Sequence, residues 1–325
     1  MKSKAVMIRA HGGPEVLELV EVDVKDPGPD EVRIKQHAIG LNFIDIYYRT
    51  GLYPIALPHG IGSEGAGVVE AVGSNVKFLK AGDRVAYPQG PIGAYAEART
   101  MPAATVVKLP KKIGFDEAAA VMLKGLTVQY LFRQTYRLQG SETILFHAAA
   151  GGVGLIACQW AKALGVTMIG TAGSDAKAEL ARANGCAHTI VYTRENFVER
   201  VREITGGKGV PVVYDSIGKD TFPASLDCLS PRGLWVLFGA ASGPVPPFDM
   251  GLLAQKGSLF ATRPTLFTYA ASRESLLAMA GEMFELMAAG KLKADVRQTF
   301  ALADAAAAHV ALESRQTTGA TVLLP

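Results

Sequence analysis

The chain of 325 residues is 49% hydrophobic and 19% charged, which is ordinary for a globular enzyme and long enough for two domains. Its 33 basic and 30 acidic side chains give a formal net charge of +3, so no polybasic arm or stripe indicates nucleic-acid binding. No stretch approaches the roughly 20 apolar residues that cross a bilayer, and the start lacks the apolar run of a signal peptide.

The three cysteines, Cys158, Cys186 and Cys228, lie far apart in segments with helical or helix-to-strand patterns. An odd number of scattered cysteines favours buried free thiols over a disulfide framework. Free thiols fit a reducing cytosol, so we expect a cytoplasmic protein.

Residues 1 to about 124 contain short apolar runs separated by glycine and proline turn signals. We expect strands at residues 4–9, 31–39, 65–72, 84–87 and 105–109. Short strands at this spacing are typical of a mostly antiparallel β-domain rather than of βαβ units.

A strand at residues 143–147, a turn of small residues at 148–154 and a helix then follow without a break. Such a turn lets the backbone approach a pyrophosphate closely, and the helix presents its positive end to it. Gly151, Gly152 and Gly154 supply positions without a Cβ, where the chain can bend sharply or touch a ligand. The segment therefore predicts a dinucleotide cofactor and redox chemistry.

The glycine motif of this turn has two registers. If it begins at Ala149, alanine replaces the first glycine; if it begins at Gly152, the motif ends in Ala157. A glycine-rich turn of this kind also occurs without a ligand. The segments that follow must therefore decide whether this turn binds a cofactor.

Strand and helix patterns alternate after the turn, which favours the cofactor. We expect strands at residues 167–172, 188–192, 210–216, 233–239 and 258–262, with helices at 175–184, 196–205 and 221–229. With the strand at 143–147, this alternation predicts an α/β fold with a doubly wound parallel six-stranded sheet. A cofactor binds over the carboxyl ends of such strands.

The last part of the chain carries two helical patterns, at residues 273–290 and 302–314, and a short strand at 321–324. A terminal strand needs a sheet to join, and the β-rich first domain is its natural host. We therefore expect a β-rich domain of residues 1–124 and 265–325. A dinucleotide-binding domain of residues 125–264 is inserted near its end, with a cleft between the two.

Several motifs occur in order along the chain: HGGPEVLEL at 11–19, GLNFIDIYYRTGLYP at 40–54, AGDRV at 81–85, LKGLTVQYL at 123–131 and VVYDSIG at 212–218. The glycine turn adds Ser141, Glu142, Leu145, Ala149, Ala150, Gly151, Gly152, Gly154, Gln159 and Lys162. With these motifs the chain resembles the zeta-crystallin-like quinone oxidoreductases of the medium-chain dehydrogenase/reductase superfamily. The resemblance implies a Rossmann domain, a mostly β GroES-like catalytic domain and a homo-oligomer.

Two positions differ from the zinc alcohol dehydrogenases of this superfamily. By resemblance, their zinc binds a Cys where this chain has Asn42, and a His of a Gly-His-Glu triplet where it has Ser63. Asn and Ser are poor zinc ligands, and all three cysteines lie outside the first domain, where a four-Cys zinc lobe would need them. His59 fits a loop position better than a ligand role. We predict a metal-free enzyme.

Without zinc, the dehydrogenation of simple alcohols loses its electrophile. Quinones and activated enones accept hydride readily and remove that need. The residues and the resemblance both favour a quinone oxidoreductase, in which nicotinamide C4 donates to a quinone held in the cleft.

The end of the second strand of the doubly wound sheet decides between the two nicotinamide cofactors. Selection of NAD usually rests on an Asp or Glu there, but this strand ends in Thr171, Ala172, Gly173 and Ser174. A 2′-phosphate fits this end, so we expect NADPH.

Lys177 and Tyr192 are the expected partners of that phosphate, and the resemblance assigns the same task to Gly173, Ser174, Lys177 and Tyr192. Two alternatives stay open. In one, Ser174 and Asp175 only cap a helix and Lys177 is a surface lysine. In the other, Asp175 turns toward the ribose and favours NADH.

The segment that replaces the zinc-ligand loop contains Asn42, Asp45, Tyr47 and Tyr53. By resemblance it faces the nicotinamide. Asn42 can bond the nicotinamide ribose or the substrate, and Tyr53 can stack on a flat ring or donate to its oxygen. For Tyr47 and Tyr48, packing at the domain boundary explains the pattern equally well.

Lys124 and Thr127 open the helix that joins the domains, where a donor could reach the cofactor or a developing quinol oxygen. Tyr53, Lys124 and solvent stay open as proton donors. No covalent intermediate is expected, because the sequence suggests no Ser-His-Asp or Cys-His arrangement.

The remaining cofactor contacts are expected at the glycine turn, at later strand ends and near the nicotinamide. They are Ala149, Gly151, Gly152, Val153, Gly154, Ser216, Phe238, Gly239, Ser242 and Phe267. Arg315 could reach a phosphate, although a surface arginine is the default interpretation.

Three further hypotheses concern the acceptor and partners. A reductase of α,β-unsaturated carbonyls would use the same cofactor. Zeta-crystallin-like proteins also include structural and RNA-binding members, which the near-neutral charge does not favour. The open apolar edge at residues 258–262 predicts a homodimer.

Overall fold

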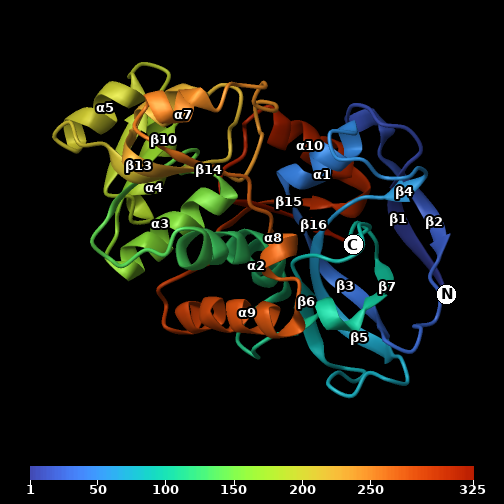
Figure 1. The fold of residues 1–325 in the computed structure, drawn as a ribbon. Coiled ribbons are helices and arrows are strands. Elements are labelled where there is room, and N and C mark those ends of the chain that lie inside the picture. Colours follow the sequence, from blue (N-terminus) through green and yellow to red (C-terminus); the bar gives the residue numbers. More distant parts are fainter. The chain divides into compact units, whose positions relative to one another are not determined.

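The computed structural model describes residues 1–325, and the chain divides into two compact units (Figure 1). The first unit contains Met1–Leu126, Tyr269–Glu285 and Lys293–Pro325, and the second contains Thr127–Thr268 and Leu286–Leu292. The predicted functional domains, residues 1–124 with 265–325 and residues 125–264, stay a prediction. None of the helices is both long and apolar enough to cross a membrane.

The first unit is mostly strand. Its strands are β1 (Lys2–Ile8), β2 (Glu18–Asp23), β3 (Glu31–Leu41), β4 (His59–Gly60), β5 (Glu64–Val72), β6 (Arg84–Tyr87), β7 (Ala98–Pro102), β8 (Val107–Lys108), β15 (Val296–Ala301) and β16 (Ala320–Leu324). Seven of them form one sheet in the order β15-β16-β3-β5-β6-β8, with β7 paired to β3, and β2-β1-β4 form a smaller sheet. Val32, Ile34 and Ile39 of β3 are buried in the core of this unit, which confirms the predicted β-rich domain.

The terminal strand joins this sheet, as predicted. β16 pairs antiparallel with β3, with Val322 opposite Gly40, and parallel with β15. The sequence patterns did not reveal β15, because its exposed positions alternate with only partly buried ones. Its partner strand, rather than its own composition, makes it a strand.

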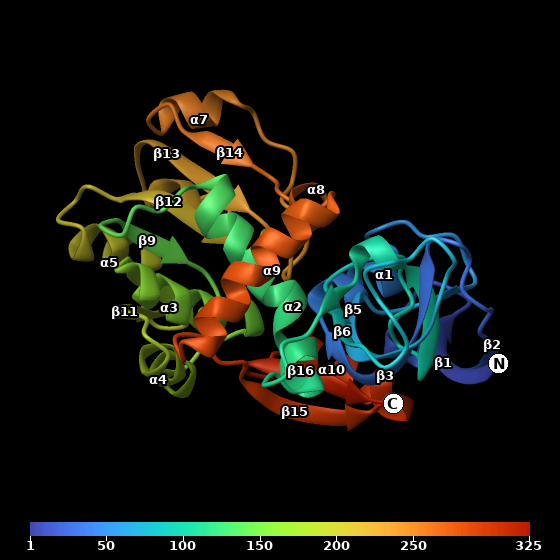
Figure 2. The same ribbon diagram turned by 90° about the horizontal axis from the view of Figure 1, so that it is seen from below.

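The helices of the first unit are α1 (Phe43–Thr50), α9 (Arg273–Ala288), α10 (Ala305–Glu313) and most of α2 (Phe115–Tyr130). Asn42 caps the start of α1, and its N–H donates to Asp45 over 3.0 Å; Gly51 caps the end of the helix with a φ of 81°. α9 lies beside α2 (Figure 2), and a Cβ on Gly125 would lie 2.4 Å from the sulfur of Met283. A larger residue at position 125 would have to displace the flexible end of the Met283 side chain.

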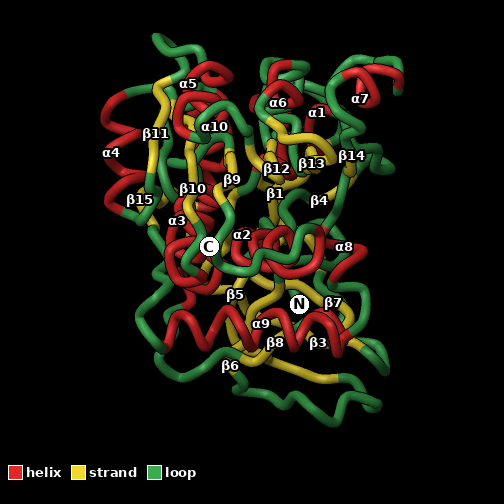
Figure 3. Tube along the Cα trace, turned by 60° about the vertical axis from the view of Figure 1, so that its left-hand side comes forward, coloured by secondary structure: helices red, strands yellow, loops and turns green.

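The second unit is an α/β layer structure. Its strands are β9 (Thr143–Phe146), β10 (Thr167–Ala172), β11 (His188–Val191), β12 (Val210–Asp215), β13 (Leu229–Leu237) and β14 (Phe260–Thr262). All pairs are parallel, in the order β11-β10-β9-β12-β13-β14, which Figure 3 shows from one edge to the other. The predicted doubly wound parallel six-stranded sheet is confirmed.

Helices α3 (Gly152–Leu164), α4 (Asp175–Ala183), α5 (Phe197–Ile204), α6 (Ala224–Asp227), α7 (Gly251–Gln255) and α8 (Leu266–Tyr269) complete this part of the chain. α3 ends at Gly165 in the left-handed region, with a φ of 77°. The helix predicted at 221–229 is shorter, because Pro223 has no N–H to donate and α6 begins only after it. Leu145, Ile169 and Val213, on three adjacent strands, lie in the core of this unit.

Candidate active site

The turn between β9 and α3 combines a left-handed alanine with a tightly packed glycine. Ala148 has a φ of 56°, whereas Gly151, Gly152 and Gly154 do not have positive φ. A Cβ on Gly154 would lie 2.3 Å from the oxygen of Ala148 and 2.6 Å from the carbonyl of Ala149, so only glycine fits. Of the two roles predicted for the glycines, a sharp bend or a close approach, Gly154 has the close approach, and the left-handed residue of the turn is Ala148. Val153 is in the first turn of α3, whose N–H groups lack partners within the helix and suit a pyrophosphate.

A buried chain of hydrogen bonds supports this turn. The hydroxyl of Thr171 accepts from the N–H of Ala148 over 3.2 Å and lies 3.0 Å from Nδ1 of His147. Nε2 of His147 lies 3.1 Å from the hydroxyl of Ser225, which donates to Asp215 over 2.9 Å. Burial lowers the pKa of His147, which favours the neutral ring. Because the hydroxyl of Ser225 donates its one proton to Asp215, Nε2 of His147 donates to Ser225. Sequence reasoning missed these supporting residues because nothing local links them.

The connection between β10 and α4 is the place predicted for the ribose. Ser174 precedes α4, and its hydroxyl accepts from the N–H of Lys177 over 3.3 Å, so Ser174 caps this helix, while its contact with a cofactor stays a prediction. Gly173 lies against Tyr192, since a Cβ at position 173 would be 2.9 Å from the phenol oxygen. The structure thus brings Gly173, Ser174 and Tyr192 together at the carboxyl ends of β10 and β11.

Asp175 is held by an arginine. Arg194 donates to both carboxylate oxygens of Asp175, over 2.6 and 2.5 Å. These bonds lower the pKa of Asp175. Both carboxylate oxygens are therefore bonded to a guanidinium, which counts against the alternative in which Asp175 turns toward a ribose.

The carboxyl ends of β12 and β13 form a third cluster of predicted residues. The carbonyl of Asp215, which ends β12, accepts from the N–H of Phe238 over 2.8 Å. A Cβ on Gly239 would lie 2.7 Å from the oxygen of Ser216. The hydroxyl of Ser242 donates to the carbonyl of Ile217, the residue after Ser216, over 2.9 Å. Backbone approach at a strand end again requires glycine.

In the first unit, three donors converge on the buried carboxylate of Glu64. The amide of Asn42 donates to Oε1 over 2.8 Å and the ammonium of Lys124 over 2.7 Å, while the N–H of Leu123 donates to Oε2 over 2.6 Å. The structure therefore brings together Asn42, at the end of β3, and Lys124, on α2. Glu64, which sequence reasoning considered only as part of a triplet, joins them.

Asp45 begins a second buried chain of polar contacts. It accepts from the hydroxyls of Ser63 and Tyr95, over 2.8 and 3.1 Å, and burial raises its pKa to about 7. Tyr95 lies 3.1 Å from Nε2 of His309, whose Nδ1 lies 2.9 Å from Arg49. Because a guanidinium only donates, Nδ1 accepts and Nε2 carries the proton. His309 has no local sequence signal and was not predicted.

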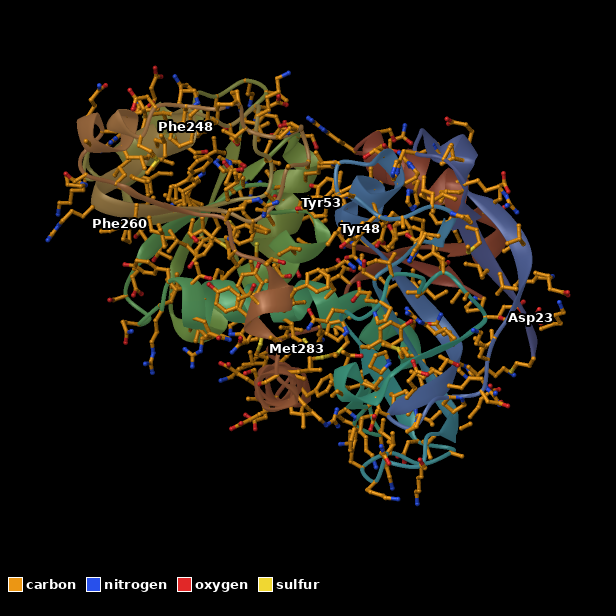
Figure 4. The ribbon with its side chains drawn as sticks, turned by 45° about the vertical axis from the view of Figure 1, so that its right-hand side comes forward. Asp23, Tyr48, Tyr53, Phe248, Phe260 and Met283 are labelled. Atoms are coloured by element: carbon orange, nitrogen blue, oxygen red, sulfur yellow. The ribbon has the colours of Figure 1, made fainter.

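Tyr53 packs in an aromatic cluster within the first unit. Its ring lies edge-on to Tyr47 and to Tyr48, with centroids 5.3 and 5.7 Å apart, and Figure 4 shows Tyr48 and Tyr53 side by side. Tyr47 is buried. Tyr47 and Tyr48 thus pack against Tyr53 within the first unit, and a role of Tyr53 in turnover stays a prediction.

Three predicted residues lie outside these clusters. Thr127 is buried on α2, Phe267 is partly exposed on α8, and Arg315 is exposed after α10 with a φ of 59°. Their contacts with a cofactor stay predictions.

The structure contains no group of three or more His, Cys, Asp or Glu side chains that could hold a metal ion. Asn42 and Ser63, at the two ligand positions of the zinc enzymes, bond carboxylates instead. Nδ1 of His59 lies 2.8 Å from the carbonyl of Gly60. Zinc independence itself stays a prediction for experiment.

Two family models match the chain. Residues 28–111 match the alcohol dehydrogenase GroES-like domain, and residues 152–278 match the model described as zinc-binding dehydrogenase. The quinone oxidoreductase of Pseudomonas aeruginosa is 60% identical over 324 residues, covering 99% of this chain and all of that one. The 2-haloacrylate reductase of a Burkholderia species is 46% identical, covering 99% and 98% of the two chains.

The fold also matches that of a solved structure closely. The crystal structure of Escherichia coli quinone oxidoreductase complexed with NADPH matches with a TM-score of 0.98 and 52% identity, covering 99% of this chain and all of that one. The chain therefore belongs to the quinone oxidoreductase family of the medium-chain dehydrogenase/reductase superfamily.

Proposed function

We propose that this chain is an NADPH-dependent quinone oxidoreductase that works without zinc. The observation that carries the proposal is that Asn42 and Ser63 stand at the zinc-ligand positions and bond Glu64 and Asp45. Without a Lewis acid, the acceptor must itself take up hydride readily, as quinones do. The 60% identical relative named quinone oxidoreductase supports this assignment.

NADPH is the proposed cofactor for two reasons. The end of β10 carries no carboxylate, and the first one along the chain, Asp175, is bonded to Arg194. The Escherichia coli relative was crystallised with NADPH. The pyrophosphate would lie against Ala149, Gly151, Gly152, Val153 and Gly154, and the 2′-phosphate near Ser174, Lys177 and Tyr192.

Asn42, Tyr53 and Lys124 are the proposed catalytic residues of the first unit. When bound, the nicotinamide supplies the hydride. The chain would orient the acceptor and exclude water, with Glu64 holding Asn42 and Lys124 in place. The proton donor is Tyr53, Lys124 or solvent.

The second candidate function is the reduction of α,β-unsaturated carbonyls with the same cofactor. The 2-haloacrylate reductase at 46% identity favours it, since its name describes an activated alkene as the substrate. The higher identity to quinone oxidoreductases places it second.

A homodimer through β14 is also proposed. This strand is an edge of the sheet and pairs only with β13. Phe260 on this strand is 60% exposed, and Figure 4 shows it at the outer margin of the second unit. An open apolar edge favours pairing with a second strand. Sedimentation of Phe260→Lys beside the unchanged chain tests this.

The proposed location is cytoplasmic. Cys158, Cys186 and Cys228 are buried free thiols, which fit a reducing compartment.

Oxidation of NADPH against benzoquinones, naphthoquinones and alkenals, with and without a chelator, tests the proposed function. We expect the highest kcat/KM with a quinone, no effect of the chelator, and lower activity with NADH. A preference for alkenals would establish the second candidate instead. Loss of activity with the chelator, or a clear preference for NADH, would contradict the proposal.

A further inference from the structure

An ion pair stands where the cofactor's ribose is expected. Asp175 is the first residue of α4, and Arg194 follows β11 in the chain. The two guanidinium nitrogens Nη1 and Nη2 donate to Oδ2 and Oδ1, over 2.6 and 2.5 Å. This fork-to-fork geometry is the strongest arrangement that a guanidinium and a carboxylate form.

The pair lies beside the strand ends that would receive the ribose. β10 and β11 are adjacent and parallel, and the N–H of Tyr192 donates to the carbonyl of Ala172 over 3.1 Å. The hydroxyl of Thr193 donates to the carbonyl of Gly173 over 3.4 Å. The segment that carries Arg194 is thus bonded to the turn that carries Asp175.

The charge of Asp175 matters for the choice of cofactor. A free carboxylate near the ribose accepts from the 2′-hydroxyl and favours NADH. The same carboxylate repels a 2′-phosphate, which carries about −1.5 to −2 charges at pH 7. Both side chains are exposed, and Arg194 bonds both oxygens and compensates the negative charge, so both effects are weakened while the pair is formed.

We infer that Arg194 is a specificity-determining residue, which keeps the site selective for NADPH by neutralising Asp175. The inference rests on the proposed cofactor site. It assigns selectivity to a residue that contacts Asp175, and not to the residues that would touch the phosphate. Removal of Arg194 should therefore act through Asp175.

The dissociation constants of NADPH and NADH test this without any acceptor, by titration of the full chain and nucleotide fluorescence. We compare the unchanged chain with Arg194→Ala, Asp175→Ala and the double variant. The matched control is Arg9→Ala, which removes an exposed arginine of the first unit that pairs with Glu18. Circular dichroism checks that each variant is folded.

Arg194→Ala should lower the preference for NADPH over NADH by about tenfold, because the freed carboxylate repels the phosphate at low salt. Asp175→Ala in the same chain should restore most of the preference, and the Arg9→Ala control should keep it. The loss should shrink in about 1 M salt, where charges are screened within roughly 3 Å.

Equal weakening of both nucleotides by Arg194→Ala would overturn the inference, because it would indicate a structural role. A preference that stays lost in the double variant would also overturn it, because Arg194 would then bind the phosphate directly. If Arg194→Ala does not fold, Asp175→Asn alone still decides: a lower preference for NADPH contradicts the inference. A chain that prefers NADPH but reduces no quinone would refute the proposed function and leave this inference standing.

Discussion

The ammonium of Lys124 lies 2.7 Å from Oε1 of Glu64, and both side chains are buried. The two residues come from α2 and from the start of β5, which are 60 positions apart. The same carboxylate oxygen accepts from Asn42. A single buried acid thus joins two residues that were predicted separately as catalytic.

Removal of the charge of Glu64 should destabilise the first unit. Glu64→Gln leaves the ammonium of Lys124 buried without a counter-charge, so we expect the free energy of unfolding to fall by about 3 kcal/mol. Glu64→Gln combined with Lys124→Met should lose less than the sum of the single changes. Urea unfolding of all four chains measures this coupling. Additive losses would show that the two side chains do not interact.

Turnover should depend on Asn42 and Tyr53 more than cofactor binding does. We expect Asn42→Ala and Tyr53→Phe to lower kcat by about tenfold, since each removes one positioned hydrogen bond, while the Kd of NADPH changes less. Tyr48→Phe is the control from the same aromatic cluster. Stopped-flow turnover and nucleotide titration separate the two effects. Unchanged kinetics in both variants would remove this loop from the mechanism.

The stability of the first unit should depend on pH through His309. Burial and the neighbouring Arg49 lower the pKa of His309 from 6.5 to about 3. Below pH 6.5 the unfolded chain therefore binds a proton that the folded chain does not, and the free energy of unfolding falls as the pH falls toward 3.

His309→Gln should remove this dependence. Between pH 7 and pH 4, the difference in unfolding free energy between the unchanged chain and the variant should shrink by up to about 3 kcal/mol. Asp45 contributes a slope of opposite sign, because its raised pKa favours the folded state at low pH. The comparison is therefore repeated in an Asp45→Asn background. A pH-independent difference would contradict the prediction.

Gly→Ala changes at two positions should have different effects: one should weaken NADPH binding, and the other should stabilise the chain. At Gly154 a Cβ would meet backbone 2.3 Å away, so Gly154→Ala should displace the turn and weaken NADPH binding by tenfold or more. At Gly281, in α9, a Cβ meets nothing within 4 Å, so Gly281→Ala should stabilise the chain by about 0.5–1 kcal/mol. Nucleotide titration and thermal unfolding of both variants measure these effects. Normal binding by Gly154→Ala would refute the role of the turn.

Local patterns in the sequence predict much of the second unit. The alternation of apolar strands with amphipathic helices, and the small residues at 148–154, depend only on neighbours in the chain. The prediction of a metal-free enzyme also needs only the residue types, since Asn42 and Ser63 are poor zinc ligands in any fold. The sequence did not reveal that the left-handed residue of this turn is Ala148.

The partners of these polar side chains emerge only in the tertiary structure. Glu64 with Lys124, Asp175 with Arg194 and Tyr95 with His309 are pairs separated by 60, 19 and 214 positions. Strand register and helix packing bring them together, and neither follows from local preference. Local residue patterns thus predicted the fold of each unit, the cofactor turn and the residue types at the metal positions. Only the fold supplies Lys124 as the partner of Glu64, and it must do so because a buried charge is stable only beside such a partner.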